Sequence, residues 1–130
     1  MIVRKYRIGD ENGIEFTDVA AKEWGGDGDA ISLYCLHHYE SYTIIDGEYK
    51  NVCCFVPVED GSEYVFFVKD RRSSSLVMKY YKQILNKRTC RVWSYAQPGQ
   101  DKMHRFFNMV KTNIVGDLEK WEVLDTPLVA

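Results

Sequence analysis

The stretch that decides the fold is residues 63–88, EYVFFVKDRRSSSLVMKYYKQILNKR. Residues 63–69 are rich in Val, Tyr and Phe, which favours a β-strand. Residues 70–75 are short and polar, which indicates a loop. After them, apolar residues recur at i, i+4 and i+8, which predicts a helix over 76–88 with one apolar face. From that face we expect Leu76, Tyr80 and Ile84 to pack against the sheet.

Toward the N-terminus, the pattern changes from helical to alternating. Residues 42–46 and 51–58 are β-rich, and the Asp-Gly pairs at 46–47 and 60–61 are hairpin signals. Together with 63–69 they predict a three-stranded meander. Residues 2–8 are expected to form an opening strand, and 14–24 and 29–40 are expected to be helices.

Toward the C-terminus, residues 89–95 predict another strand, which the Pro-Gly pair at 98–99 ends. Asp101 is expected to cap a helix. Its apolar stripe would be Met103, Phe106, Phe107, Val110 and Ile114. Residues 120–124 predict a last strand. The predicted order is strand, two helices, meander, helix, strand, helix, strand, which is a mixed α/β sheet around a strand–loop–helix unit.

Length and composition exclude several classes of protein. The chain has 130 residues, 45% of them hydrophobic and 28% charged, which is typical of one soluble domain, 1–130. No apolar run approaches the roughly 18 residues that a membrane span needs. The opening residues lack the apolar core of a signal peptide, so we expect a cytoplasmic location.

The cysteines and histidines do not form a metal-binding pattern. Of the four cysteines, none lies in a C-x-x-C pair, and the three histidines add no ligand spacing. We therefore expect no metal site and reduced cysteines in the core. In a strand, Cys53 and Cys54 would point to opposite faces.

Charge is unevenly divided along the chain. The net charge is −2, but residues 1–63 carry 13 acidic and 5 basic residues, a balance of −8, and residues 64–130 carry 6 acidic and 12 basic, a balance of +6. The basic excess is densest in 69–91. It is either a solvated helix face or a patch that holds a phosphate-bearing molecule or an acidic partner. A net acidic chain argues against general nucleic-acid binding.

The predicted order, over essentially the whole chain, resembles the GCN5-related N-acetyltransferase (GNAT) fold. Local likeness lies in residues 31–34, in the basic helix 73–88 followed by a Trp-bearing strand at 91–95, and above all in 103–111, MHRFFNMVK. It is most similar to the short phage-encoded members, which include an internal virion protein of short-tailed coliphages. The resemblance implies a three-layer fold and acetyl-CoA as the cofactor.

In that family, coenzyme A pyrophosphate binds on backbone amides at the start of the helix after the central strand. The family loop carries glycines, so that the backbone can approach the phosphates. This chain has no glycine there and an unfavourable Asp70. The resemblance implies that the cofactor-binding residues, if binding is retained, are Arg71, Arg72, Ser73, Ser74 and Ser75.

Catalysis in the family needs a base for the amine and an acid for the leaving thiolate. The tyrosine that often serves as the acid is replaced here by Phe106-Phe107. Tyr95 and His104 are candidate substitutes. Glu63, at the start of the central strand, is the candidate base.

Three functions remain open from the sequence. One is a GNAT-fold protein with a degenerate cofactor loop and little catalysis, acting by contacts with phage or host proteins in virion assembly or host takeover. Another is an acetyl-CoA-dependent N-acetyltransferase. The third is a small inhibitor of a host defence protein, using the acidic front half. The expected location is the host cytoplasm or the virion.

Overall fold

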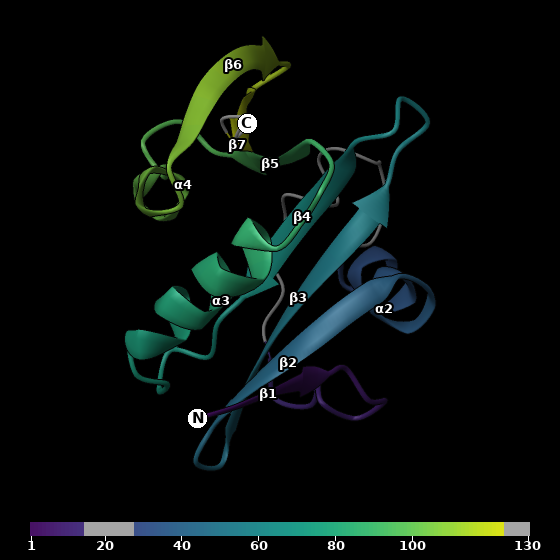
Figure 1. Cartoon of the computed structure of the whole chain (residues 1–130), viewed down its shortest axis with the longest axis vertical. Helices are drawn as coiled ribbons and strands as arrows, with labels where there is room; N and C mark the ends of the chain where they lie inside the picture. Colours follow the sequence, from purple (N-terminus) through teal and green to yellow (C-terminus); the bar gives the residue numbers. More distant parts are fainter. Residues whose placement is uncertain (15–27, 124–130) are drawn as a thin grey trace.

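The computed structural model describes residues 1–14 and 28–123. Within these ranges seven strands form one sheet, in the order β1-β2-β3-β4-β5-β7-β6 (Figure 1). The strands are β1 (Ile2–Lys5), β2 (Glu40–Asp46), β3 (Tyr49–Pro57), β4 (Glu63–Val68), β5 (Val92–Ala96), β6 (Met109–Val115) and β7 (Leu118–Val123). The described helices are α2 (Gly28–His38), α3 (Leu76–Asn86) and α4 (Lys102–Phe106). The mixed α/β architecture predicted from the sequence is confirmed.

The predicted meander forms as β2, β3 and β4, joined antiparallel. Each hairpin turns at the glycine of its Asp-Gly pair, because Gly47 and Gly61 have φ of 61° and 87°, a region that favours residues without a Cβ. Since β2 and β4 both run antiparallel to β3, they run parallel to each other. Their C-terminal ends therefore lie at the same edge of the sheet, which places the end of β2 beside the loop after β4.

Helices cover both faces of the sheet, which makes three layers (Figure 1). On one face α3 packs Val77, Tyr81, Ile84 and Leu85 against the sheet; on the other, α2 packs Cys35 and Leu36. Cys53 belongs to the first core and Cys54 to the second, as alternation predicts. The described cysteines are free, and burial raises the pKa of Cys54 to about 12, so its thiol stays protonated.

Strands β4 and β5 are paired in parallel only at their beginnings. The register joins Glu63 to Val92 and Tyr64 to Trp93, and no later pair follows. The two strands therefore diverge toward their C-terminal ends. A pocket lies between them there, and it is described below.

The predicted C-terminal helix is wrong beyond residue 106. α4 ends at Phe106, Asn108 has a φ of 61°, and β6 follows. A left-handed residue interrupts the helix, and the β-branched residues of 109–115 favour a strand. Val110 and Ile114 are consequently exposed on β6 instead of forming a buried stripe.

Other predicted boundaries need smaller corrections. Leu76 is exposed and does not pack against the sheet, although Ile84 does and Tyr80 is partly buried. The opening strand is shorter than 2–8, and β5 begins at Val92 instead of residue 89. The helix expected over 14–24 lies almost entirely outside the described residues. No helix in the described ranges is long and apolar enough to cross a membrane.

Candidate functional site

The loop between β4 and α3, residues 69–75, is held by side chains from its neighbours. Buried Asn51 on β3 accepts a hydrogen bond from the Asp70 amide (2.7 Å) and donates one to the Ser73 hydroxyl (2.9 Å). The Lys69 ammonium donates to the carbonyls of Asp70 (3.1 Å) and Ser73 (2.8 Å). The loop is therefore fixed on the edge of the sheet by internal hydrogen bonds.

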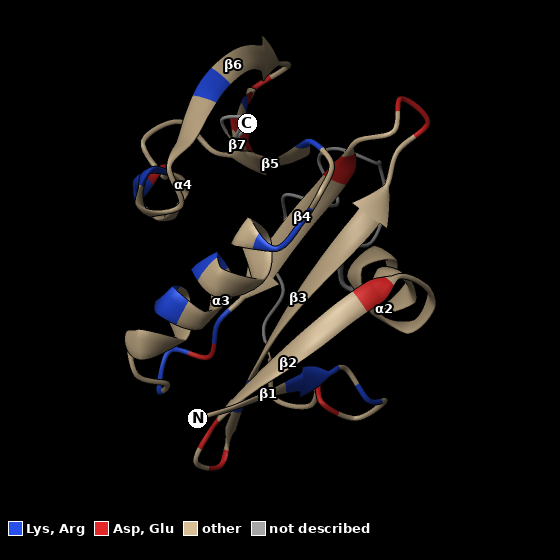
Figure 2. Cartoon of the chain, viewed as in Figure 1, with Lys and Arg blue, Asp and Glu red and all other residues tan. Residues whose placement is uncertain are grey.

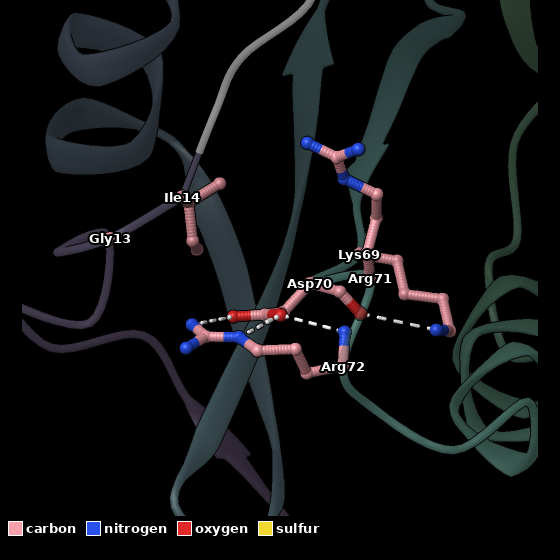
Figure 3. Close-up of a pocket in the computed structure, with 6 residues that line it drawn as sticks. All are labelled: Gly13, Ile14, Lys69, Asp70, Arg71 and Arg72. Atoms are coloured by element: carbon pink, nitrogen blue, oxygen red, sulfur yellow. Dashed lines mark hydrogen bonds and ion pairs between the residues drawn. The ribbon is translucent and has the colours of Figure 1, made fainter.

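Asp70 and Arg72 form a closed pair in this loop. The Asp70 carboxylate accepts hydrogen bonds from the Arg72 amide (2.9 Å) and from two guanidinium nitrogens (3.0 and 2.8 Å). These bonds lower the pKa of Asp70 to about 2. Figure 3 shows Arg72 folded onto Asp70, while Arg71 points away from that pair, along the wall of a pocket of about 430 Å³.

The next amide of the loop is taken by a carboxylate from another strand. The Ser74 amide donates to the Asp46 carboxylate at the end of β2 (2.6 Å). The Leu76 amide donates to the Ser74 hydroxyl (3.1 Å), and the Ser73 amide to the Asp70 carbonyl (3.0 Å). Three amides of the loop and the first amide of α3 are thus satisfied by acceptors of the chain itself.

This arrangement does not fit a bound pyrophosphate. A phosphate at a helix N-terminus needs unpaired amide donors and no competing negative charge. Here the carboxylates of Asp46 and Asp70 accept from two of these donors, the amides of Ser74 and Arg72, and put negative charge beside them. In the loop predicted to bind coenzyme A, carboxylates of the chain itself therefore already accept from amides that a phosphate would need.

A second cavity lies where β4 and β5 diverge. It measures about 400 Å³, and its lining includes Tyr64 and Phe66 of β4, Tyr95 of β5, and Met103 and His104 of α4. Tyr64 and Tyr95 are in ring contact, with centroids 5.9 Å apart. We call it the splay pocket. It brings together two of the three predicted catalytic residues, Tyr95 and His104.

His104 is the unusual group in the splay pocket. The side chain is 3% exposed, and neither ring nitrogen has a hydrogen-bond partner in the described part of the chain. Burial lowers the pKa of the imidazole, and the carboxylates of Asp101 and Glu119 offset part of that shift. The lowered pKa favours the neutral form of the ring.

The third predicted catalytic residue, Glu63, lies apart from the splay pocket. Its carboxylate accepts two hydrogen bonds from Arg88, at 2.9 and 2.6 Å. Arg88 also pairs with Glu40 and stacks over the Phe55 ring, 4.2 Å from the centroid. These contacts give Glu63 a structural role, tying the start of β4 to the end of α3.

Phe106 and Phe107 stand where proteins of the family that the sequence resembles often have a tyrosine, and neither carries a hydroxyl. Phe107 is buried, with its ring centroid 4.8 Å from that of Phe67, and Phe106 is exposed. Neither can donate a proton. Among the described residues, no group of three or more His, Cys, Asp or Glu side chains is arranged to hold a metal ion.

Sequence patterns do not identify Asp46 and Asn51 as hydrogen-bond partners of the loop. They indicate only a hairpin turn at Asp46 and a strand position at Asn51. The meander itself carried the signal, because it places the end of β2 and the start of β3 beside the loop that follows β4.

Comparisons with known proteins support the fold. No protein-family model matches the chain, and no curated protein matches it. Among solved structures, a chimera of the spermidine N-acetyltransferase SpeG of Vibrio cholerae and hSSAT matches with a TM-score of 0.59 and 10% identity, covering 95% of this chain and 96% of that one. A point mutant of the Vibrio cholerae SpeG matches with a TM-score of 0.61 and 11% identity, covering 95% of each chain. The GNAT fold expected from the sequence is confirmed.

Proposed function

We propose that this GNAT-fold protein acts through protein–protein contacts, in virion assembly or host takeover by a phage, with little or no acetyl transfer. One observation carries the proposal: the carboxylates of Asp46 and Asp70 accept hydrogen bonds from the Ser74 and Arg72 amides, in the loop that leads into α3. The phage setting rests on the sequence resemblance to short phage-encoded members of the family.

Electrostatics supports this function over cofactor binding. A pyrophosphate would have to displace two carboxylates from their hydrogen bonds and then remain close to both. Displacing Asp70 would also break its ion pair with Arg72 (2.8 Å). Phe107 in place of the family's tyrosine removes the acid as well, and losing one such group costs about 10²–10⁴-fold in rate.

A second function, acetyl-CoA-dependent N-acetyl transfer, is favoured by the splay pocket. The divergence of β4 and β5 leaves an opening between two strands, and an unpartnered His104 lies in its wall beside Tyr95. A neutral imidazole can accept a proton from an amine, and a tyrosine hydroxyl can donate one. Under this alternative the acyl group would enter the splay pocket.

Thermal shift and thiol release together decide between the two functions. A ligand that binds only the folded state raises stability, so a binding protein shows a higher Tm with acetyl-CoA. We expect no change in Tm at about 1 mM acetyl-CoA, near the upper end of usual KM values. We also expect no thiol release with spermidine, aminoglycosides or lysine peptides.

Turnover of about 1 per second or more would overturn the proposal and establish the acetyltransferase. In that case, replacing Tyr95 with Phe and His104 with Gln, one at a time, identifies the acid and the base. A rise in Tm without turnover would also contradict the proposed loss of cofactor binding.

A further inference from the structure

An apolar groove lies between α3 and α4. Its volume is about 680 Å³. The residues that line it are Ser75, Leu76, Met78, Lys79, Lys102, Met103 and Phe106. Leu76 is 55% exposed and Phe106 is 45% exposed. We call this the α3–α4 groove; neither Asp46 nor Ser74 is among the residues that line it.

The floor of the groove has the composition of a binding surface. Leu76 and Phe106 are the exposed apolar residues of α3 and α4, and they come from segments about thirty positions apart that the fold brings to one cavity. Met78 and Met103 are partly buried and line the same cavity. Methionine side chains are flexible and polarisable, which suits them to surfaces that receive another apolar chain.

The rim of the groove is positive. Lys79 and Lys102 line it, and the Lys82 ammonium lies 5.1 Å from the centroid of the Phe106 ring. Figure 2 shows basic residues on both α3 and α4. No lining residue is acidic, and the nearest carboxylate in sequence, Asp101, is paired with Arg105. The described rim therefore presents lysines without a compensating acid.

We propose that the α3–α4 groove docks an acidic amphipathic segment of a partner protein. Its apolar side chains lie on Leu76, Met103 and Phe106, and its carboxylates face Lys79, Lys82 and Lys102. Charge complementarity selects the occupant, because an acidic segment gains from three lysines and a basic one is repelled. This inference rests on the proposed function and names its partner class.

The test uses a synthetic helical peptide of about four turns, with Leu at i, i+3, i+4 and i+7 and Glu at the outward positions. Fluorescence anisotropy with the full chain is expected to give a Kd of about 1–100 µM at low salt. Binding weakens as salt is raised, because added salt shortens the Debye length and so screens the attraction between the lysines and the glutamates. A second peptide with Lys in place of every Glu is the control, and we expect it not to bind.

Two matched variants locate the site. Lys79→Glu reverses a rim charge and is expected to weaken binding about tenfold or more. Lys87→Glu makes the same charge change just beyond the end of α3, outside the groove lining, and is expected to weaken binding less than about twofold. Phe106→Ala, at an exposed position, is expected to weaken binding without lowering Tm.

Three results would overturn the inference: no saturable binding of the acidic peptide, equal effects of the two lysine variants, or displacement of the peptide by acetyl-CoA. Its failure is distinguishable from failure of the proposed function, which is measured as acetyl-CoA turnover on the same preparation. Peptide binding together with acetyl-CoA turnover refutes only the proposal of little or no acetyl transfer. Absence of both peptide binding and turnover refutes the groove alone.

Discussion

His104 is a buried imidazole with no hydrogen-bond partner among the described residues, packed near the Trp121 ring. An unsatisfied buried polar group costs about 1–3 kcal/mol. Replacing it with an apolar residue of similar volume removes that cost. We therefore expect His104→Leu to raise the free energy of unfolding by about 1 kcal/mol at pH 7.

The pH dependence of this gain has a defined sign. The folded-state pKa of His104 is lowered, so the unfolded chain takes up a proton more readily. The wild type therefore loses stability as the pH falls below about 6.5, and the leucine variant does not lose this contribution. Urea unfolding of both proteins at pH 7 and at about pH 5.5, one unit below the ordinary histidine pKa, measures the difference. A variant less stable than the wild type would show that the ring nitrogens have partners.

Asp10 is the buried carboxylate that joins the segment after β1 to the sheet. Burial alone would raise its pKa, but bonds from Arg4 (2.7 and 2.9 Å), Thr43 (2.7 Å) and the Arg7 amide (2.9 Å) lower it well below the ordinary value. We expect Asp10→Asn to cost about 2 kcal/mol at pH 7, since hydrogen bonds to a charged group are worth about 1.5–3 kcal/mol.

The stability that Asp10 contributes has a defined pH window. Because the folded pKa is depressed, the contribution is fully present above the unfolded value of about 3.9 and is lost as the pH falls toward the folded value. The difference between wild type and Asp10→Asn should therefore be constant from pH 7 to about 5 and shrink below about 4. A difference that grows on acidification would contradict this assignment. Far-UV circular dichroism in urea measures it.

At the scale of elements, α3 has one face buried in the core and an exposed first residue, Leu76. Ile84 packs in the core and Leu76 is exposed in the α3–α4 groove. Ile84→Ala should cost about 2–5 kcal/mol, because it leaves a cavity. Leu76→Ala should cost less than about 0.5 kcal/mol. Chemical denaturation of both variants checks this. Equal losses would mean that the helix is rotated or misplaced.

Elements with strong local periodicity could be predicted from the sequence, and α3 is one of them. A meander and an amphipathic helix carry strong local periodicity, so β2–β4 and α3 were predicted close to their observed bounds. The segment 101–115 was not, because its apolar spacing fits a helix while a left-handed Asn108 and β-branched neighbours make a helix followed by a strand. The period alone could not separate these two outcomes.

The position of the loop could be predicted from the sequence, but the hydrogen bonds that occupy its amides could not. A polar loop before a helix is a local pattern, so residues 70–75 could be located from the sequence. The meander places Asp46 near the loop, but its hydrogen bond to the Ser74 amide joins residues 28 positions apart and forms only in the assembled sheet. The divergence of β4 and β5 depends on pairing between strands, which no local pattern specifies.

At the scale of the whole molecule, sheet topology brings an acidic turn onto a basic loop. The acidic front half and basic back half of the chain meet where the end of β2 lies against the start of α3. If this internal contact is what excludes an external anion, then removing it should restore anion binding. The prediction concerns the fold as a scaffold, because α3 and the sheet that support the loop stay unchanged.

The test is the double variant Asp46→Ala with Asp70→Ala. It frees the Ser74 and Arg72 amides and releases the Arg72 guanidinium, so coenzyme A or inorganic pyrophosphate should now bind at the start of α3. At about ten times Kd, binding stabilises the fold by about 1.4 kcal/mol, which raises Tm by about 3–6 °C. Glu48→Ala removes a carboxylate from the same hairpin turn without touching these amides, and it should leave Tm insensitive to both ligands. If the double variant also gains no shift, the serines themselves exclude phosphate, since their Cβ atoms stand where the family's glycines leave room.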